Sequence, residues 1–136
     1  MSKKILLAAI NAKYIHSNLA VYCLDAYARK YSEAVKDGRV SVIYREFTIN
    51  QQIDEILEEI YREKPDVIGF SCYIWNISYV MTLIKELKVL LPHTDIWLGG
   101  PEVSYNREEI LQEHPEITGV MCGEGERVFA SLCDYY

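Results

Sequence analysis

The sequence predicts an α/β fold in which a five-stranded parallel sheet carries helices on both faces. Three observations predict it: short apolar runs recur along the 136 residues, amphipathic segments separate them, and no repeat, low-complexity stretch or linker interrupts the pattern. Strict alternation of strand and helix favours parallel strands, because each helical crossover returns the chain to the same end of the sheet. Five such units fit a doubly wound, flavodoxin-like (Rossmann-like) sheet of order 2-1-3-4-5 better than a six-stranded dinucleotide fold.

The expected strands differ in their hydrophobic pattern. Residues 3–10, KKILLAAI, form an apolar run typical of a strand buried on both faces. Residues 39–47, RVSVIYREF, alternate apolar and polar side chains, which is typical of a strand nearer the edge. The three remaining strands are short and apolar, and the last two end at glycine: 66–72, 95–100 and 117–123.

Five segments between and after these strands place apolar residues at helical spacing, and they cover residues 18–35, 51–63, 76–91, 106–113 and 125–135. Three of the predicted helices are followed closely by a proline, a residue that cannot continue a helix, at Pro65, Pro92 and Pro115.

Composition limits the classes of function. Half of the residues are hydrophobic and the net charge is −6, with no cluster of lysine or arginine, so we expect a single globular domain over 1–136 that binds no nucleic acid. No apolar run approaches the roughly 20 residues that span a bilayer. The four cysteines include no C-x-x-C pair, which argues against a structural zinc or a self-contained iron–sulfur site and favours a reducing, cytoplasmic location.

A ligand of a doubly wound sheet binds beyond the carboxyl ends of its strands. The segments expected there are 11–18, 71–76, 99–104 and 123–126, and two of them contain a glycine pair with a glutamate. Glycine lets a backbone approach a ligand closely, although such glycines can also simply end a strand. Two glycine turns on neighbouring strands favour a pocket lined by backbone.

Residue types at this edge separate the possible ligands. Residues 8–16 contain no glycine, which argues against a nicotinamide dinucleotide. Asn11 and Ser71 stand where a phosphorelay receiver needs carboxylates for magnesium. Tyr14 and His16 are too bulky to cradle the phosphate of a flavin mononucleotide. A broad, flat ligand laid across the sheet edge remains.

Two motifs carry a resemblance to a known family. LGGPEVS, residues 98–104, and GVMCGEGE, residues 119–126, resemble the N-terminal cobalamin-binding domain of cobalamin-dependent radical S-adenosylmethionine proteins. That family includes enzymes like the anaerobic magnesium-protoporphyrin IX monomethyl ester oxidative cyclase, and the resemblance covers essentially the whole chain. It implies cobalamin bound at the carboxyl edge, by residues expected to be Asn11, Tyr14, His16, Ser71, Tyr73, Gly99, Gly100, Pro101, Glu102, Gly123, Glu124 and Gly125.

The resemblance also implies a larger protein. Its catalytic barrel would carry a C-x-x-x-C-x-x-C motif, which is absent here, and would use S-adenosylmethionine and a [4Fe-4S] cluster. The 136 residues are therefore expected to be a fragment whose partner is the C-terminal barrel of the same chain. The fragment alone is not expected to be an enzyme, whereas the intact protein is expected to catalyse methyl transfer or oxidative cyclisation.

Several of the residues expected to bind cobalamin have two possible roles. Cobalamin domains of the methionine-synthase and mutase kind carry D-x-H-x-x-G, but here Tyr14 replaces the aspartate and Leu19 the glycine. His16 is thus either the lower cobalt ligand or a hydrogen-bonding residue of a loop or helix start. Ser71 either contacts the nucleotide base or ends a strand, and Tyr73 either covers the corrin or belongs to an interface. A cofactor-free protein-interaction module of the same fold is the alternative function, and a flavin-binding electron carrier is a further one.

Overall fold

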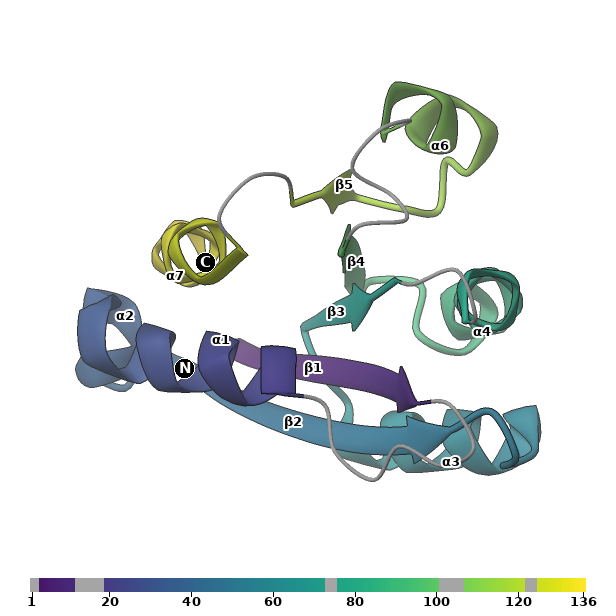
Figure 1. Ribbon diagram of the computed structural model, residues 1–136, viewed down its shortest axis with the longest axis horizontal. Helices are drawn as coiled ribbons and strands as arrows, with labels where there is room; N and C mark the ends of the chain where they lie inside the picture. The colour runs from purple at the N-terminus through teal and green to yellow at the C-terminus, as the bar shows by residue number, and fades with distance from the viewer. Residues whose placement is uncertain (1–2, 12–18, 73–75, 101–106, 122–124) are drawn as a thin grey trace.

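A computed structural model describes residues 3–11, 19–72, 76–100, 107–121 and 125–136 of the chain. Its strands form a single parallel sheet in the order β2-β1-β3-β4-β5, with helices on both faces (Figure 1). The predicted fold class is therefore confirmed. The strands are β1 (Lys3–Asn11), β2 (Val40–Thr48), β3 (Val67–Ser71), β4 (Asp95–Gly99) and β5 (Gly119–Val120).

Strand β1 is buried on both faces, as its apolar run predicts. It pairs with β2 on one side and with β3 on the other. Leu6, Ala8 and Ile10 belong to one hydrophobic core, while Ile5 and Leu7 belong to the core on the opposite face. The alternation in β2 marks an edge strand, because β2 pairs with β1 alone among the described strands.

Each face of the sheet is covered by a different set of helices (Figure 1). Helices α3 (Ile53–Glu63), α4 (Ile77–Leu90) and α6 (Arg107–Glu113) bury their apolar residues in the core that contains Leu6 and Ile10. Helices α1 (Leu19–Tyr31), α2 (Glu33–Lys36) and α7 (Gly125–Tyr135) lie over the other core. None of the helices in the described ranges is long and apolar enough to cross a bilayer.

The helix expected over 18–35 is two helices, which corrects the prediction. Ser32 separates α1 from α2 with an extended backbone, at φ −87° and ψ 120°. The Ser32 hydroxyl accepts a hydrogen bond from Val35 N, so the serine serves as the N-cap of the second, four-residue helix. Amphipathic spacing continues across the break, and for that reason the sequence pattern did not reveal it.

Strand β5 is also shorter than the predicted 117–123. Ile117 N donates to His114 O in a turn after α6, and the strand begins only at Gly119. Thr118 N then donates to Ile96 O and Met121 N to Leu98 O, both at 2.7 Å, which ties this segment to β4. The Trp97 ring covers Gly119 so closely that a Cβ there would lie 2.4 Å from the ring.

Helix α7 is fastened by polar contacts near its C-terminal end. Asp134 Oδ1 accepts hydrogen bonds from Ser32 Oγ at 2.7 Å and from Ala34 N at 3.0 Å. The Tyr136 hydroxyl donates to Asp95 and accepts from Trp97 Nε1 at 3.0 Å, which attaches the end of the helix to β4. Burial and the hydrogen bond to the Asp95 carboxylate raise the pKa of Tyr136 to about 12.

We predict that Asp134→Ala lowers the free energy of unfolding by about 1–2 kcal/mol, because it leaves the buried Ser32 hydroxyl and Ala34 N without their acceptor. Urea unfolding at neutral pH measures the loss. The Ser32 hydroxyl and the Ala34 amide hold the pKa of Asp134 below its ordinary value of 3.8. The carboxylate therefore stabilises the fold above the unfolded-state pKa, and this contribution is lost as the pH falls through the lowered, folded-state pKa.

The matched control is Glu59→Ala, which removes an exposed carboxylate from the middle of α3. We expect it to change the free energy of unfolding by less than about 0.5 kcal/mol. An equal loss of unfolding free energy in both variants would contradict the role of Asp134 as acceptor. So would a difference in unfolding free energy between Asp134→Ala and wild type that does not become smaller at acid pH.

Candidate functional site

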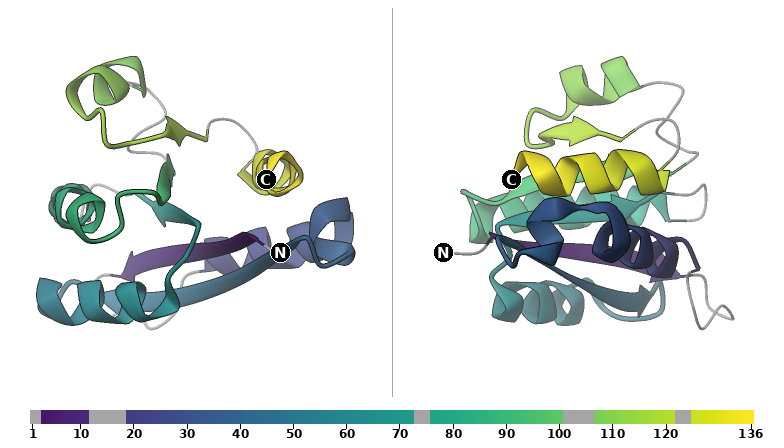
Figure 2. Two further views of the ribbon diagram at one scale, coloured as in Figure 1. Left: turned by 180° about the vertical axis from the view of Figure 1, so that it is seen from behind. Right: turned by 90° about the vertical axis from the view of Figure 1, so that its left-hand side faces the viewer.

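The carboxyl ends of β1, β3 and β4 lie in one row. Ala9 pairs with Ser71, and Ser71 pairs with Gly99, so the three strands reach the same edge in register. In the right-hand view of Figure 2, β1 runs toward this edge and α7 runs back from it beside α1. The side chains expected to meet a ligand at these strand ends are therefore brought together where the structure describes them.

The row lies at the point where the sheet reverses its winding. The connection after β1 leads to α1 on one face, whereas the connection after β3 leads to α4 on the other (Figure 1). Since strands β1 and β3 are neighbours, their carboxyl ends form the topological switch point, where ligands of open α/β sheets bind. Sequence order and strand pairing thus place the candidate site between Asn11 and Ser71.

Solvent exposure differs among the residues of this edge, and Asn11 and Cys72 are buried. Ser71, Gly99 and Gly100 are partly exposed, whereas Phe70 and Leu98, one step earlier on their strands, are fully buried. The exposed positions carry a hydroxymethyl group or no side chain at all. The edge of β3 and β4 is therefore lined by backbone and small polar groups.

Asn76 is a buried residue of this edge that the sequence analysis did not single out. It is 1% exposed and directly precedes α4. Its side-chain Nδ2 donates to Ile10 O at 3.0 Å and to Ser71 O at 3.1 Å, so it joins the ends of β1 and β3. The preference of asparagine for the position before a helix could have marked it, but its side chain makes no cap hydrogen bond to α4.

Gly100 owes its identity to the protein's own backbone. Its φ is +102°, and a Cβ would lie 2.4 Å from Cys72 O and 2.9 Å from Cys72 N. In the same contact, Cys72 N donates to Gly99 O at 2.7 Å. The close approach that was predicted for a ligand is thus made, at Gly100, by the segment that follows β3. Whether Gly100 also contacts a ligand remains a prediction.

Gly99 has room for a methyl group. A Cβ at this position would meet Met121 Cε at 3.5 Å and Phe70 O at 4.0 Å, both ordinary van der Waals distances. Packing within the described structure therefore does not require a glycine here. Gly99 differs in this respect from its neighbour Gly100.

The other predicted residues divide into those the structure describes and those it does not. Asn11 ends β1 and is 3% exposed, and its carbonyl accepts from Ile49 N at 3.0 Å. Gly125 is the first residue of α7 and so begins a helix. The predicted residues outside the described ranges are Tyr14, His16, Tyr73, Pro101, Glu102, Gly123 and Glu124.

The described residues of this edge are uncharged. Asn11, Ser71, Asn76 and the two glycines carry no formal charge. Asn11 and Asn76 are buried, so the partly exposed residues are Ser71, Gly99 and Gly100. Within the described ranges, no three His, Cys, Asp or Glu side chains are placed to chelate a metal ion. No buried side-chain nitrogen or oxygen there lacks a hydrogen-bond partner. The described part of this edge thus presents small, uncharged residues.

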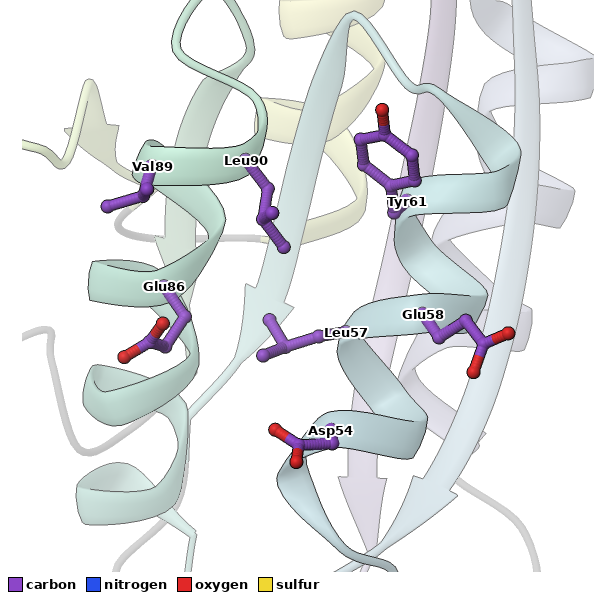
Figure 3. A pocket seen from close by; sticks show the side chains of 7 residues that line it. All are labelled: Asp54, Leu57, Glu58, Tyr61, Glu86, Val89 and Leu90. Atoms are coloured by element: carbon purple, nitrogen blue, oxygen red, sulfur yellow. The ribbon is translucent and has the colours of Figure 1, made fainter.

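A groove elsewhere on the molecule has a different character. It has a volume of about 350 Å³ and lies between α3 and α4 (Figure 3). Leu57 and Leu90 point toward each other across its floor, and carboxylates lie nearby (Figure 3). It is formed by the side chains of two helices rather than by strand ends, so it is separate from the candidate site. Its lining residues are Asp54, Leu57, Glu58, Tyr61, Glu86, Val89 and Leu90.

Curated relatives match this chain over part of their own length. The chain is 30% identical over 107 residues to the cobalamin-dependent radical SAM methyltransferase TokK of Streptomyces tokunonensis, and the match covers 76% of this chain and 15% of TokK. It is 29% identical over 108 residues to the anaerobic magnesium-protoporphyrin IX monomethyl ester cyclase of Rubrivivax gelatinosus, covering 79% of this chain and 19% of the cyclase. The chain thus spans less than a fifth of either relative.

A solved structure shares the fold. The cobalamin-dependent S-adenosylmethionine radical enzyme OxsB, with aqua-cobalamin and S-adenosylmethionine bound, superposes with a TM-score of 0.74 at 17% identity. The similarity covers 98% of this chain and 18% of OxsB. The family model described as the B12 binding domain matches residues 5–133, nearly the whole sequence. The chain therefore belongs to the B12-binding domain family and is related to the cobalamin-dependent radical SAM enzymes.

Proposed function

We propose that this domain holds cobalamin at the carboxyl edge of its sheet and presents it to a separate radical S-adenosylmethionine catalytic domain. The observation that carries the proposal is the single row formed by Ser71 and Gly99 at the switch point beside β1. A row of small and side-chain-free positions would leave space for a broad corrin and its nucleotide tail. Membership of the B12-binding family supports this choice of ligand.

The residues of the edge receive distinct roles in the proposal. Asn11 and Ser71 lie at the ends of β1 and β3, and Ser71 would face the nucleotide base. The turns that begin at Gly99 and Gly123 would line the nucleotide tail, together with Gly100, Pro101 and Gly125. The carboxylates of Glu102 or Glu124 would accept hydrogen bonds from ligand hydroxyls or amides, while Tyr14 and Tyr73 would cover the corrin.

The whole protein's reaction belongs to the same proposal. We assign the domain to a larger radical S-adenosylmethionine enzyme, in which the partner domain would bind S-adenosylmethionine and a [4Fe-4S] cluster. TokK is named a methyltransferase and the Rubrivivax protein a cyclase, so methyl transfer and oxidative cyclisation are both consistent with the relatives. When bound, cobalamin would supply a cobalt centre able to carry a methyl group. This chain's own residues would hold and orient it.

A cofactor-free interaction module is the second candidate. It is favoured by Tyr14 and Leu19, which replace the aspartate and glycine of the D-x-H-x-x-G motif. It is also consistent with Gly100, whose glycine is required by contact with Cys72 and not by a ligand alone. Direct binding separates the two candidates.

We predict that the purified domain retains hydroxocobalamin. After incubation with excess hydroxocobalamin and removal of free ligand by gel filtration, the protein fraction should carry corrin absorbance in the visible region, close to one equivalent per chain. The melting temperature should rise with ligand concentration, because a ligand that binds the native state stabilises that state by mass action. A colourless protein with an unchanged melting temperature would favour the interaction module.

We predict that His16→Ala shifts the visible spectrum of the bound corrin if the imidazole is the lower cobalt ligand. The physical reason is that replacing a nitrogen ligand by water or an empty position changes the field at cobalt. Absorbance spectra of the two loaded proteins at equal occupancy measure the shift, with His93→Ala, which changes an exposed histidine, as the control. Identical spectra for wild type and His16→Ala would remove His16 from the coordination sphere.

We predict opposite outcomes for the two neighbouring glycines. Gly99→Ala should fold normally, since its methyl group meets Met121 at an ordinary distance, yet it should weaken cobalamin binding about tenfold, or ~1.4 kcal/mol, by filling space at the edge. Gly100→Ala should instead lower the free energy of unfolding by roughly 2 kcal/mol or more, because its φ is positive and its methyl group would overlap the Cys72 carbonyl.

Urea unfolding and equilibrium dialysis with hydroxocobalamin measure the two effects separately. Wild-type affinity in a folded Gly99→Ala variant would exclude Gly99 from the ligand contact. Unchanged stability of Gly100→Ala would contradict the backbone contact with Cys72.

A further inference from the structure

The side-chain amide of Asn76 bonds β1 to β3 where the backbone pairing of these two strands ends. The register of these two strands ends at the pair Ala9 and Ser71, while β1 continues to pair with β2 as far as Asn11. Asn76 Nδ2 then donates to Ile10 O and to Ser71 O, one acceptor from each strand. A single side chain therefore bonds one carbonyl of β1 and one of β3 at the point where the pairing between these two strands ends.

The position of this bridge coincides with the switch point. The chain passes from β1 toward α1 on one face and from β3 toward α4 on the other, and Asn76 is the residue immediately before α4. Its side chain is directed back to the strand ends and makes no cap hydrogen bond to its own helix. The side chain thus bonds the two strand ends instead of capping α4, and it fixes the distance between those ends.

We infer that Asn76 is a positioning residue of the cobalamin site, and this inference rests on the proposed function. By fixing Ile10 O and Ser71 O to one amide nitrogen, Asn76 fixes how far the edges of β1 and β3 lie apart where the ligand would enter. Ser71 is paired in register with Gly99, so the bridge also sets the place of the glycine edge of β4. Asn76 itself need not touch the ligand.

Few other side chains can replace this amide. A primary amide carries two N–H donors on one nitrogen, and both of these partners are carbonyl oxygens, which only accept. Alanine would leave both carbonyls without this donor in a buried place, since Asn76 is 1% exposed. Aspartate has the same shape but, when ionised, only accepts, and it would set a charge against two carbonyl oxygens.

The test compares variants that lose stability in different places. Asn76→Ala and Asn76→Asp remove the bridge, while Asp134→Ala removes the contact of α7 with Ser32 and Ala34, which lies on the other helical layer. For each purified protein, urea unfolding gives the folded fraction, and equilibrium dialysis gives the hydroxocobalamin Kd of the folded domain. Hydrogen exchange of the Cys72 and Met121 amides, which bond Gly99 O and Leu98 O, reports whether the edge has loosened locally.

We expect both Asn76 variants to weaken hydroxocobalamin binding at least tenfold after correction for the folded fraction, with faster exchange at Cys72 than in wild type. Asp134→Ala should stay within about twofold of the wild-type Kd in spite of its lower stability. Asn76→Ser, which keeps one donor, provides a milder variant and should fall between wild type and Asn76→Ala.

The outcomes separate the inference from the proposed function. Wild-type protein that binds hydroxocobalamin, together with a folded Asn76 variant of unchanged Kd, would overturn the positioning role and leave cobalamin binding intact. An equal loss of affinity in Asp134→Ala would also overturn it, because the effect would then be general destabilisation. Wild-type protein that binds no hydroxocobalamin would overturn the proposed function, and the inference with it.

Discussion

The shared register of β1, β3 and β4 is the constraint on which the rest of the structure depends. Parallel strands paired without slippage end at one edge, and here the pairs Ala9–Ser71 and Ser71–Gly99 fix that edge. A slip by one residue would turn every buried side chain of β1 to the wrong face. Because β1 is buried on both sides, with Leu6 in one core and Leu7 in the other, such a slip would disrupt both cores at once.

Backbone hydrogen bonds shape the edge of the sheet as much as side chains do. Where the ladder stops, peptide groups still need partners, and the chain supplies them locally: Cys72 N bonds Gly99 O, and Asn76 bonds the carbonyls of Ile10 and Ser71. Gly100 allows the β4 turn to pass against Cys72, which no side chain would permit. Among the described residues, the carbonyls of Ile10, Ser71 and Gly99 are thus bonded within the protein, while Ser71 and Gly99 remain partly exposed.

Much of the fold could be predicted from the sequence because its hydrophobic periods are local and strong. The apolar run of β1, the alternation in β2 and the helical spacing of α3 and α4 each identified an element, and their strict order gave the sheet topology. The two element boundaries that were predicted wrongly lie where the hydrophobic pattern continues through a break in the structure. Ser32 breaks a helix through a cap and a contact with Asp134, 102 positions away in the sequence, and the turn at Ile117 delays β5.

The candidate site was likewise predictable from the sequence only in part. The sequence by itself determined that Asn11, Ser71 and Gly99 lie at the ends of strands, and a parallel sheet must then bring them to a common edge. It also determined the family, through glycine motifs whose letters can be recognised without coordinates. Only the tertiary structure decided that Gly100 serves contact with Cys72 while Gly99 has room to spare, and that Asn76 bonds Ile10, 66 positions away. The physical reason is that periodicity records which face a residue occupies, whereas the partner of a buried hydrogen bond is chosen by packing between segments that are distant in the chain.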